Sequence, residues 1–427
     1  MRLSDYNTPL SGMLAAQLGL KTTQQNLSNV HTPGYVRQMV NYGTVGGSNG
    51  NTFTQQIGYG VETLSIDRIT DEIKAGQYNN QLSQFAQHSY MGAFLSEIEA
   101  SVGMPGEGSL PSLMNKFLNG FREIAKNPGQ TNNYHALIAD AKKFMDHVNR
   151  LEDSLGKAKL TAQKDTVDHI GEFNRLSKSL AEANKKIGEA GSPVPSQLLD
   201  ERDAIITEMS QYANIEVSYE SINPNIASVR INGMLTVSGQ DTYEIQLNAN
   251  KTGIQISGTD VPLKGGSILA TFEAQEAVTK YEEKLQGFMN SLKDEVNTVT
   301  TDAGIGEFFQ GEGKEIHINK SFEKDPLLMK INDLNQLQKL KDIADFDYSA
   351  LNDLVVGIAA DVKQANVKTA IHGDMLNGIA EQKQGMEGVN IDEEMVNLMT
   401  YQRYFIANSK AINTLNEVFD SLFSIMR

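Results

Sequence analysis

The chain has 427 residues, 40% hydrophobic and 21% charged, which is enough for more than one domain with a buried core. Its net charge of −16 disfavours nucleic-acid binding, because phosphate recognition needs clustered Lys and Arg. The sequence has no Cys, which excludes disulfides, thiolate nucleophiles and Cys-bound metals. No apolar run approaches the roughly 18 residues of a membrane span, and residues 1–6 do not open a signal peptide, so neither membrane insertion nor a cleaved signal is expected.

The first thirty residues have the heptad spacing of a helix that pairs with another helix. Gly12 and Gly19 each weaken an isolated helix by roughly 1 kcal/mol relative to Ala, so we expect this helix to need a partner. Apolar residues and two glutamines alternate at intervals of four and three. This predicted N-terminal assembly seam consists of Tyr6, Leu10, Met13, Gln17, Leu20, Gln24 and Leu27.

A turn is predicted directly after this helix. Pro33 biases Thr32 toward extended geometry, and Gly34 can take the positive φ of a type II turn. The predicted turn motif is Thr32, Pro33, Gly34 and Tyr35.

The middle of the chain has a mainly helical pattern. Residues 61–160 are expected to be helical, beginning with a face formed by Ile66, Ile69 and Ile73, and with breaks at 102–111 and 126–133. Further helical runs are expected from Tyr134 toward Ile187, at 196–212, from Gly265 to Val296 and from Leu351 toward Ile379.

Residues 215–263 have a different pattern. Val, Ile, Thr and Tyr alternate at period two, and Asn232-Gly233 and other turn residues separate the runs. This pattern predicts a small antiparallel sheet inserted in the helical body.

The last forty residues have a stricter heptad. Asn390 can cap this helix, and the acidic residues 392–394 in its first turn suit the helix dipole. Glu394 and Asn408 occupy two seam positions. The predicted C-terminal assembly seam consists of Ile391, Leu398, Tyr401, Phe405, Ile412, Leu415, Phe419, Leu422 and Met426.

Each terminal helix has a wide apolar edge that would be exposed without a partner. We therefore predict that the two ends pair with each other and with copies from other subunits; the alternative is two ordinary amphipathic helices on a globular core. The predicted fold is mainly α, a long helical bundle with paired N- and C-terminal helices and a small inserted antiparallel β domain. The predicted domains are residues 1–39 with 386–427 (coiled-coil-like inner domain), 40–214 with 264–385 (helical body) and 215–263 (β insertion).

Catalytic and ligand-binding patterns do not emerge from the sequence. The seven His form no HExxH or close pair, and residues 304–315 fail the spacing of a phosphate-binding loop. Residues 345–353 begin like a calcium loop, but Ala350 replaces its Gly. We expect no catalytic residue, metal or cofactor, and no enzyme activity.

Both ends of the chain resemble the signatures of bacterial flagellar axial proteins. At the N-terminus the matching residues are Asn26, Leu27, Asn29, Thr32, Pro33, Gly34, Tyr35, Arg37 and Gln38. Residues 388–426 resemble the C-terminal signature, with Tyr401, Gln402, Arg403, Ala407, Asn408 and Phe419 at the family's positions. Rod and hook proteins share these ends, whereas residues 198–212, 231–239 and 307–311 resemble segments of the hook-associated protein 1 family, the proteins of the hook–filament junction.

The resemblance implies a structural adaptor that assembles as a ring on the hook tip, so that the filament can attach. It implies other copies of the chain, the hook protein, hook-associated protein 3 and an export chaperone on the C-terminal helix as partners. It also implies an extracellular place in the flagellum, reached through flagellar type III export. The alternatives are a hook or rod structural protein of the same group, or a secreted enzyme or adhesin on this scaffold.

Overall fold

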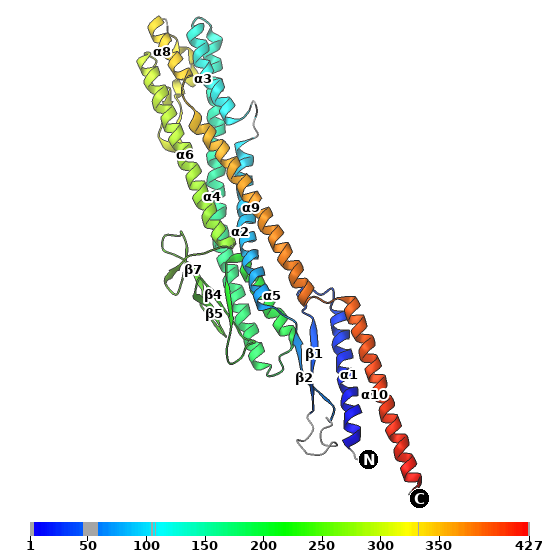
Figure 1. Ribbon diagram of the computed structural model, residues 1–427. Helices are drawn as coiled ribbons and strands as arrows, with labels where there is room; N and C mark the ends of the chain where they lie inside the picture. The colour runs from blue at the N-terminus through cyan, green and yellow to red at the C-terminus, as the bar shows by residue number, and fades with distance from the viewer. Residues whose placement is uncertain (1–3, 46–58, 104–105, 107, 332, 426–427) are drawn as a thin grey trace.

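The computed structural model describes residues 4–45, 59–103, 106, 108–331 and 333–425. These residues form an elongated molecule, with a body of long helices at one end and two paired terminal helices at the other (Figure 1). Both termini lie at the same end of the molecule. The first helix leads from the N-terminus toward the body, and the last helix leads from the body back to that end. This architecture confirms the predicted mainly α fold. No helix in the described ranges combines the length and hydropathy needed to cross a membrane.

Long helices packed along one another build the body (Figure 1). α4 alone has 59 residues and is about 88 Å long at ~1.5 Å per residue. In α3, buried side chains recur every three or four residues, so one face packs on α4. At its centre Phe117 contacts the rings of Phe121, Phe144 and Phe308. The body helices are α2 (Glu72–Val102), α3 (Leu110–Lys126), α4 (Thr131–Glu189), α5 (Ser196–Tyr212), α6 (Ser267–Asp302) and α9 (Ser349–Glu387).

The predicted β insertion is present and packs on the side of α4 (Figure 1). It consists of a four-stranded and a three-stranded antiparallel sheet with neighbouring strands in chain order. Asn232 and Gly233 connect β4 and β5 with φ of 46° and 82°, as a two-residue hairpin turn requires. The strands are β3 (Glu216–Tyr219), β4 (Ala227–Ile231), β5 (Met234–Ser238), β6 (Asp241–Thr242), β7 (Ile245–Leu247), β8 (Ile254–Ile256) and β9 (Thr259–Val261).

Short elements cap the far end of the body between α6 and α9. Phe308 and Phe322 from this region are buried in the main core. The elements are β10 (Phe309–Gln310), η2 (Gly313–Glu315), β11 (His317–Ile318), α7 (Lys320–Lys324), η3 (Pro326–Met329) and α8 (Leu334–Ala344).

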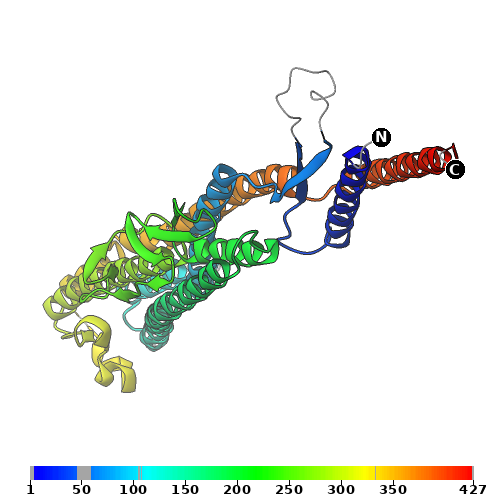
Figure 2. The same ribbon diagram turned by 90° about the horizontal axis from the view of Figure 1, so that it is seen from below.

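The terminal end contains α1 (Ser4–Ser28), α10 (Ile391–Ile425) and a hairpin of β1 (Gln38–Thr44) and β2 (Val61–Arg68). Figure 2 shows the hairpin and α1 side by side, with α10 beyond. The hairpin is fastened to α1, since the Tyr42 hydroxyl donates to the carbonyl of Ala15.

The prediction that helix extends from residue 61 is wrong for residues 61–68, which form β2. The spacing of Ile66, Ile69 and Ile73 imitates a helical face, but β-branched residues favour the strand that antiparallel pairing with β1 provides. The helix begins only at Glu72, capped by Asp71. The predicted division into three domains stays a prediction. It assigned residues 40–68 to the body, whereas the hairpin lies against α1.

Candidate assembly surface and its junction with the body

The terminal helices α1 and α10 lie side by side and antiparallel (Figure 1). A Cβ on Gly19 would lie 2.7 Å from the Tyr401 ring, so only a glycine admits that ring against the α1 backbone. Each step of seven residues along α1 matches a step of seven back along α10, which fixes one register. The matched pairs are Gly12 with Asn408, Gly19 with Tyr401, and Asn26 with Glu394.

A fourth contact closes the pair near the N-terminus. The Tyr6 ring stacks on Phe419 with 5.4 Å between centroids, and its hydroxyl donates to Asn416 Oδ1 at 2.6 Å. The Ser409 hydroxyl lies 3.5 Å from the sulfur of Met13.

The predicted N-terminal seam lies beside this contact rather than at its centre. The centre is the line of Gly12, Gly19 and Asn26, whereas Leu10 is 42% exposed. Gln17 and Gln24 are exposed as well. The seam residues that are half-buried at the edge of the contact are Tyr6, Met13, Leu20 and Leu27.

The predicted C-terminal seam faces α1 over most of its length. Ile391 is 47% exposed at the start of α10, and Leu422 is 44% exposed beyond the stretch that α1 covers. Met426 lies outside the described residues. The half-buried members are Leu398, Tyr401, Phe405, Ile412, Leu415 and Phe419.

The predicted turn at residues 32–35 is present. The Tyr35 amide donates to the carbonyl of Thr32, and Gly34 has φ of 76°, as a type II turn requires. Thr32, Pro33 and Gly34 are exposed, but Tyr35 is half-buried and points back toward α1.

A buried polar cluster joins α1, this turn and α10. Asn26 is 1% exposed, and its Oδ1 accepts from the Tyr35 hydroxyl and the Gln38 amide. Its Nδ2 donates to the carbonyl of Gln38 and to Glu394. Glu394, also 1% exposed, accepts from Arg37 Nε at 2.8 Å. Burial, then Asp200 and Glu394 nearby, raises the pKa of Tyr35 to about 12, so its hydroxyl stays a donor near neutral pH.

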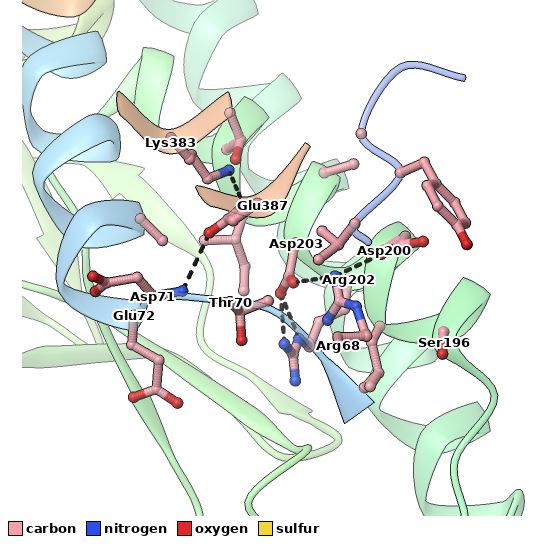
Figure 3. A pocket seen from close by; sticks show the side chains of 18 of the residues that line it. Arg68, Thr70, Asp71, Glu72, Ser196, Asp200, Arg202, Asp203, Lys383 and Glu387 are labelled. Atoms are coloured by element: carbon pink, nitrogen blue, oxygen red, sulfur yellow. Dashed lines mark hydrogen bonds and ion pairs between the residues drawn. The ribbon is translucent and has the colours of Figure 1, made fainter. Parts of the chain in front are cut away.

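The same turn attaches the terminal end to the body. The Arg37 amide donates to the carbonyl of Glu387 in the last turn of α9. The Glu387 side chain accepts from the Asp71 amide at the start of α2 and pairs with Lys383 (Figure 3). Residues 388–390 separate α9 from α10, and Asn390 caps α10 as predicted.

A cleft of about 1640 Å³ lies where β2, the turn, α2, α5 and the end of α9 meet (Figure 3). Arg68 of β2 reaches Asp200 and Asp203 of α5 at 2.6 and 2.9 Å. Its side chain is 7% exposed. Burial raises the pKa of the Asp200 carboxyl, and Arg68 opposes that shift. These ion pairs hold the β1–β2 hairpin on the body. We therefore assign Arg68, Asp200 and Asp203 a structural role.

Sequence reasoning missed the cluster around Asn26, Arg37 and Glu394. The available signal was Glu394 itself, an acidic residue at a seam position. A buried carboxylate needs a cationic partner, and Arg37 is the arginine of the N-terminal signature. The turn, which the sequence did predict, is what brings the two together.

Comparisons with known proteins identify relatives of this chain. The family model "Flagellar hook-associated protein FlgK helical domain" matches residues 95–307, and "Flagellar basal body rod FlgEFG protein C-terminal" matches residues 384–425. Flagellar hook-associated protein 1 of Bacillus subtilis (strain 168) is 24% identical over 98% of this chain and 97% of its own. The protein of that name from Escherichia coli (strain K12) is 22% identical over 98% and 99%. The chain belongs to the flagellar hook-associated protein 1 family.

Family membership places the chain among the structural proteins of the flagellum, which associate with other axial components. A solved structure, "The structure of the flagellar hook junction protein FlgK from Burkholderia pseudomallei", is similar with 19% identity and a TM-score of 0.49. That match covers 55% of this chain and 46% of the other.

Proposed function

We propose that this chain joins hook and filament by assembling as a ring on the hook tip. The nearly full-length similarity to proteins named flagellar hook-associated protein 1 supports the junction. The observation that carries the assembly is the terminal pair, because α1 covers one face of α10 and leaves large apolar side chains exposed on the rest. Those exposed side chains include Met395, Val396, Tyr404, Ile406, Leu422 and Phe423.

Apolar side chains in this number on a projecting helix are typical of a protein–protein contact. The proposed partners are further copies of the chain in the ring, the hook protein below and hook-associated protein 3 above. Before assembly, an export chaperone would cover the C-terminal helix. The chain would reach the outside of the cell through flagellar type III export, without a cleaved signal.

The test places one charge in the predicted C-terminal seam. Phe419→Asp replaces the ring that stacks on Tyr6 with a carboxylate, so the terminal pair should open. In a strain that lacks the native gene, this variant should still be secreted but should not support filaments. Asn413→Asp, which adds the same charge on an exposed position of α10, is the matched control and should restore motility.

Normal motility with Phe419→Asp would contradict the assignment of the seam to assembly. The competing assignment, a rod or hook protein, has the match of residues 384–425 to a rod-protein model in its favour. The two assignments predict different results when the gene is deleted. Loss of a rod or hook protein removes the hook itself, whereas loss of a junction protein leaves the hook in place.

A further inference from the structure

The surface of α10 is divided into three lengthwise faces. One is the half-buried seam against α1. A second face, exposed, holds all the charged residues between positions 395 and 425, namely Arg403, Lys410, Glu417 and Asp420, together with the exposed Met395, Met399 and Ile406. The third face holds no charged residue.

This third face, which we call the open stripe, has heptad spacing of its own. Its members recur at intervals of three and four, so they line up along the helix. All but Thr400 are exposed, and Val396, Tyr404 and Ile425 are more than half exposed. The open stripe consists of Val396, Thr400, Tyr404, Ala407, Ala411, Thr414, Val418, Leu422 and Ile425.

A second exposed line of heptad spacing runs along α1. It is apolar at its N-terminal end, where Leu10 and Leu14 are 42% and 55% exposed. Lys21 is its one charged member. This outer stripe consists of Leu10, Leu14, Gln17, Lys21 and Gln24.

The two stripes lie on opposite sides of the terminal pair. On one side Met13 contacts Ser409, and at 100° per residue the outer stripe continues around α1 from Met13. On the other side a groove is lined by Thr8 and Pro9 of α1 and by Ala411 and Thr414 of α10. The open stripe therefore faces away from the outer stripe of its own chain.

We propose that the open stripe of α10 binds the outer stripe of α1 from a neighbouring copy. The inference rests on the proposed ring and names which helices meet in it. Because the stripes lie on opposite sides, one copy offers α10 and the next offers α1, which is a head-to-tail contact that can close into a ring. All copies point the same way, so this pairing is antiparallel, like the one within the chain.

Side-chain size and charge favour this occupant. At the register of the intrachain pair, with no axial offset between copies, Leu14 lies level with Ala407 and Leu10 with Ala411, so the outer stripe covers the open stripe from Val396 to Ala411. Large side chains then meet small ones, as in the contacts at Gly12 and Gly19. The four charged residues of α10 stay in water, and each α10 lies between two copies of α1.

Disulfide trapping tests the proposal, because the chain has no Cys of its own. A variant with Leu14→Cys and Ala407→Cys is expressed in a strain that lacks the native gene, and isolated hooks are oxidised. The expected result is a ladder of dimers, trimers and longer multimers on a non-reducing gel. Two further variants pair Leu14→Cys with Ala411→Cys or with Thr414→Cys. They would form the disulfide if neighbouring copies are shifted along the helix axis.

The matched control pairs Leu14→Cys with Lys410→Cys on the charged face and should give monomer. A ladder from that control, or a dimer from Ala407→Cys alone, would overturn the proposal in favour of another face or an α10–α10 contact. Monomer from all three open-stripe variants, in cells that carry filaments, would overturn it and leave the junction function standing. Filaments that persist without the gene would overturn the junction function itself.

Discussion

Replacing Arg37 tests the account of the junction most sharply. In Arg37→Ala the Glu394 carboxylate loses its cation while its side chain stays 2% exposed. Asn26 Nδ2, at 3.2 Å, is then its remaining side-chain donor. The turn would keep its backbone bond to Glu387 but lose both ion pairs to α10.

The expected cost follows from the burial. Removing one partner of a buried ion pair destabilises a protein by about 3–5 kcal/mol. Arg37 is 19% exposed, so water screens part of the pair, and we expect the lower end, about 3 kcal/mol. The loss should be local to α1 and α10, because the body has a separate core.

Hydrogen exchange measures this loss where it occurs. At about 1.4 kcal/mol per factor of ten, amides of α10 between residues 394 and 419 should exchange roughly 100- to 200-fold faster. Arg175→Ala is the matched control, since it removes an arginine from a solvent-exposed pair with Glu172 and should leave exchange in α10 unchanged. Replacing both partners, Arg37→Met with Glu394→Leu, should restore most of the protection.

Equal effects from Arg37→Ala and Arg175→Ala would refute this reasoning. So would acceleration that extends evenly into α4 and α6, because the cluster would then stabilise the whole chain rather than the terminal end.

Two further predictions concern stability. Gly19→Ala should destabilise the terminal pair by about 1–3 kcal/mol, because the added Cβ would meet the Tyr401 ring. Gly156→Ala should stabilise α4 by up to about 1 kcal/mol, because the added Cβ would have nothing within 4 Å. Urea unfolding followed by circular dichroism distinguishes them, and the same sign for both would contradict the packing. Burial, then His372, lowers the pKa of His88 below 6.5, so the folded state binds fewer protons and stability should fall as pH falls from about 7 toward 5. His88→Gln should make that fall shallower, and an unchanged slope in unfolding titrations would count against it.

Periodicity predicted the long elements because their burial is regular. The C-terminal heptad is half-buried at the expected positions, since one straight helix packs along another. The β insertion followed from period-two alternation and from Asn232-Gly233. In each case the local pattern and the tertiary contact agree.

The hairpin could not be found in this way, because it packs against one helix and leaves Leu64 and Ile66 exposed. Its alternation is therefore weak, and the isoleucine spacing points to a helix. The N-terminal seam is a different case. Its heptad is real, but the intrachain contact centres on glycines and an asparagine, which a search for apolar residues passes over.

Electron microscopy of cells that lack this chain, with flagellin assayed in the medium, tests the junction function most directly. The account predicts hooks of normal form without filaments, and flagellin shed into the medium. Cells without hooks would assign the chain to the rod or hook. Normal filaments on intact hooks would contradict a role at the junction.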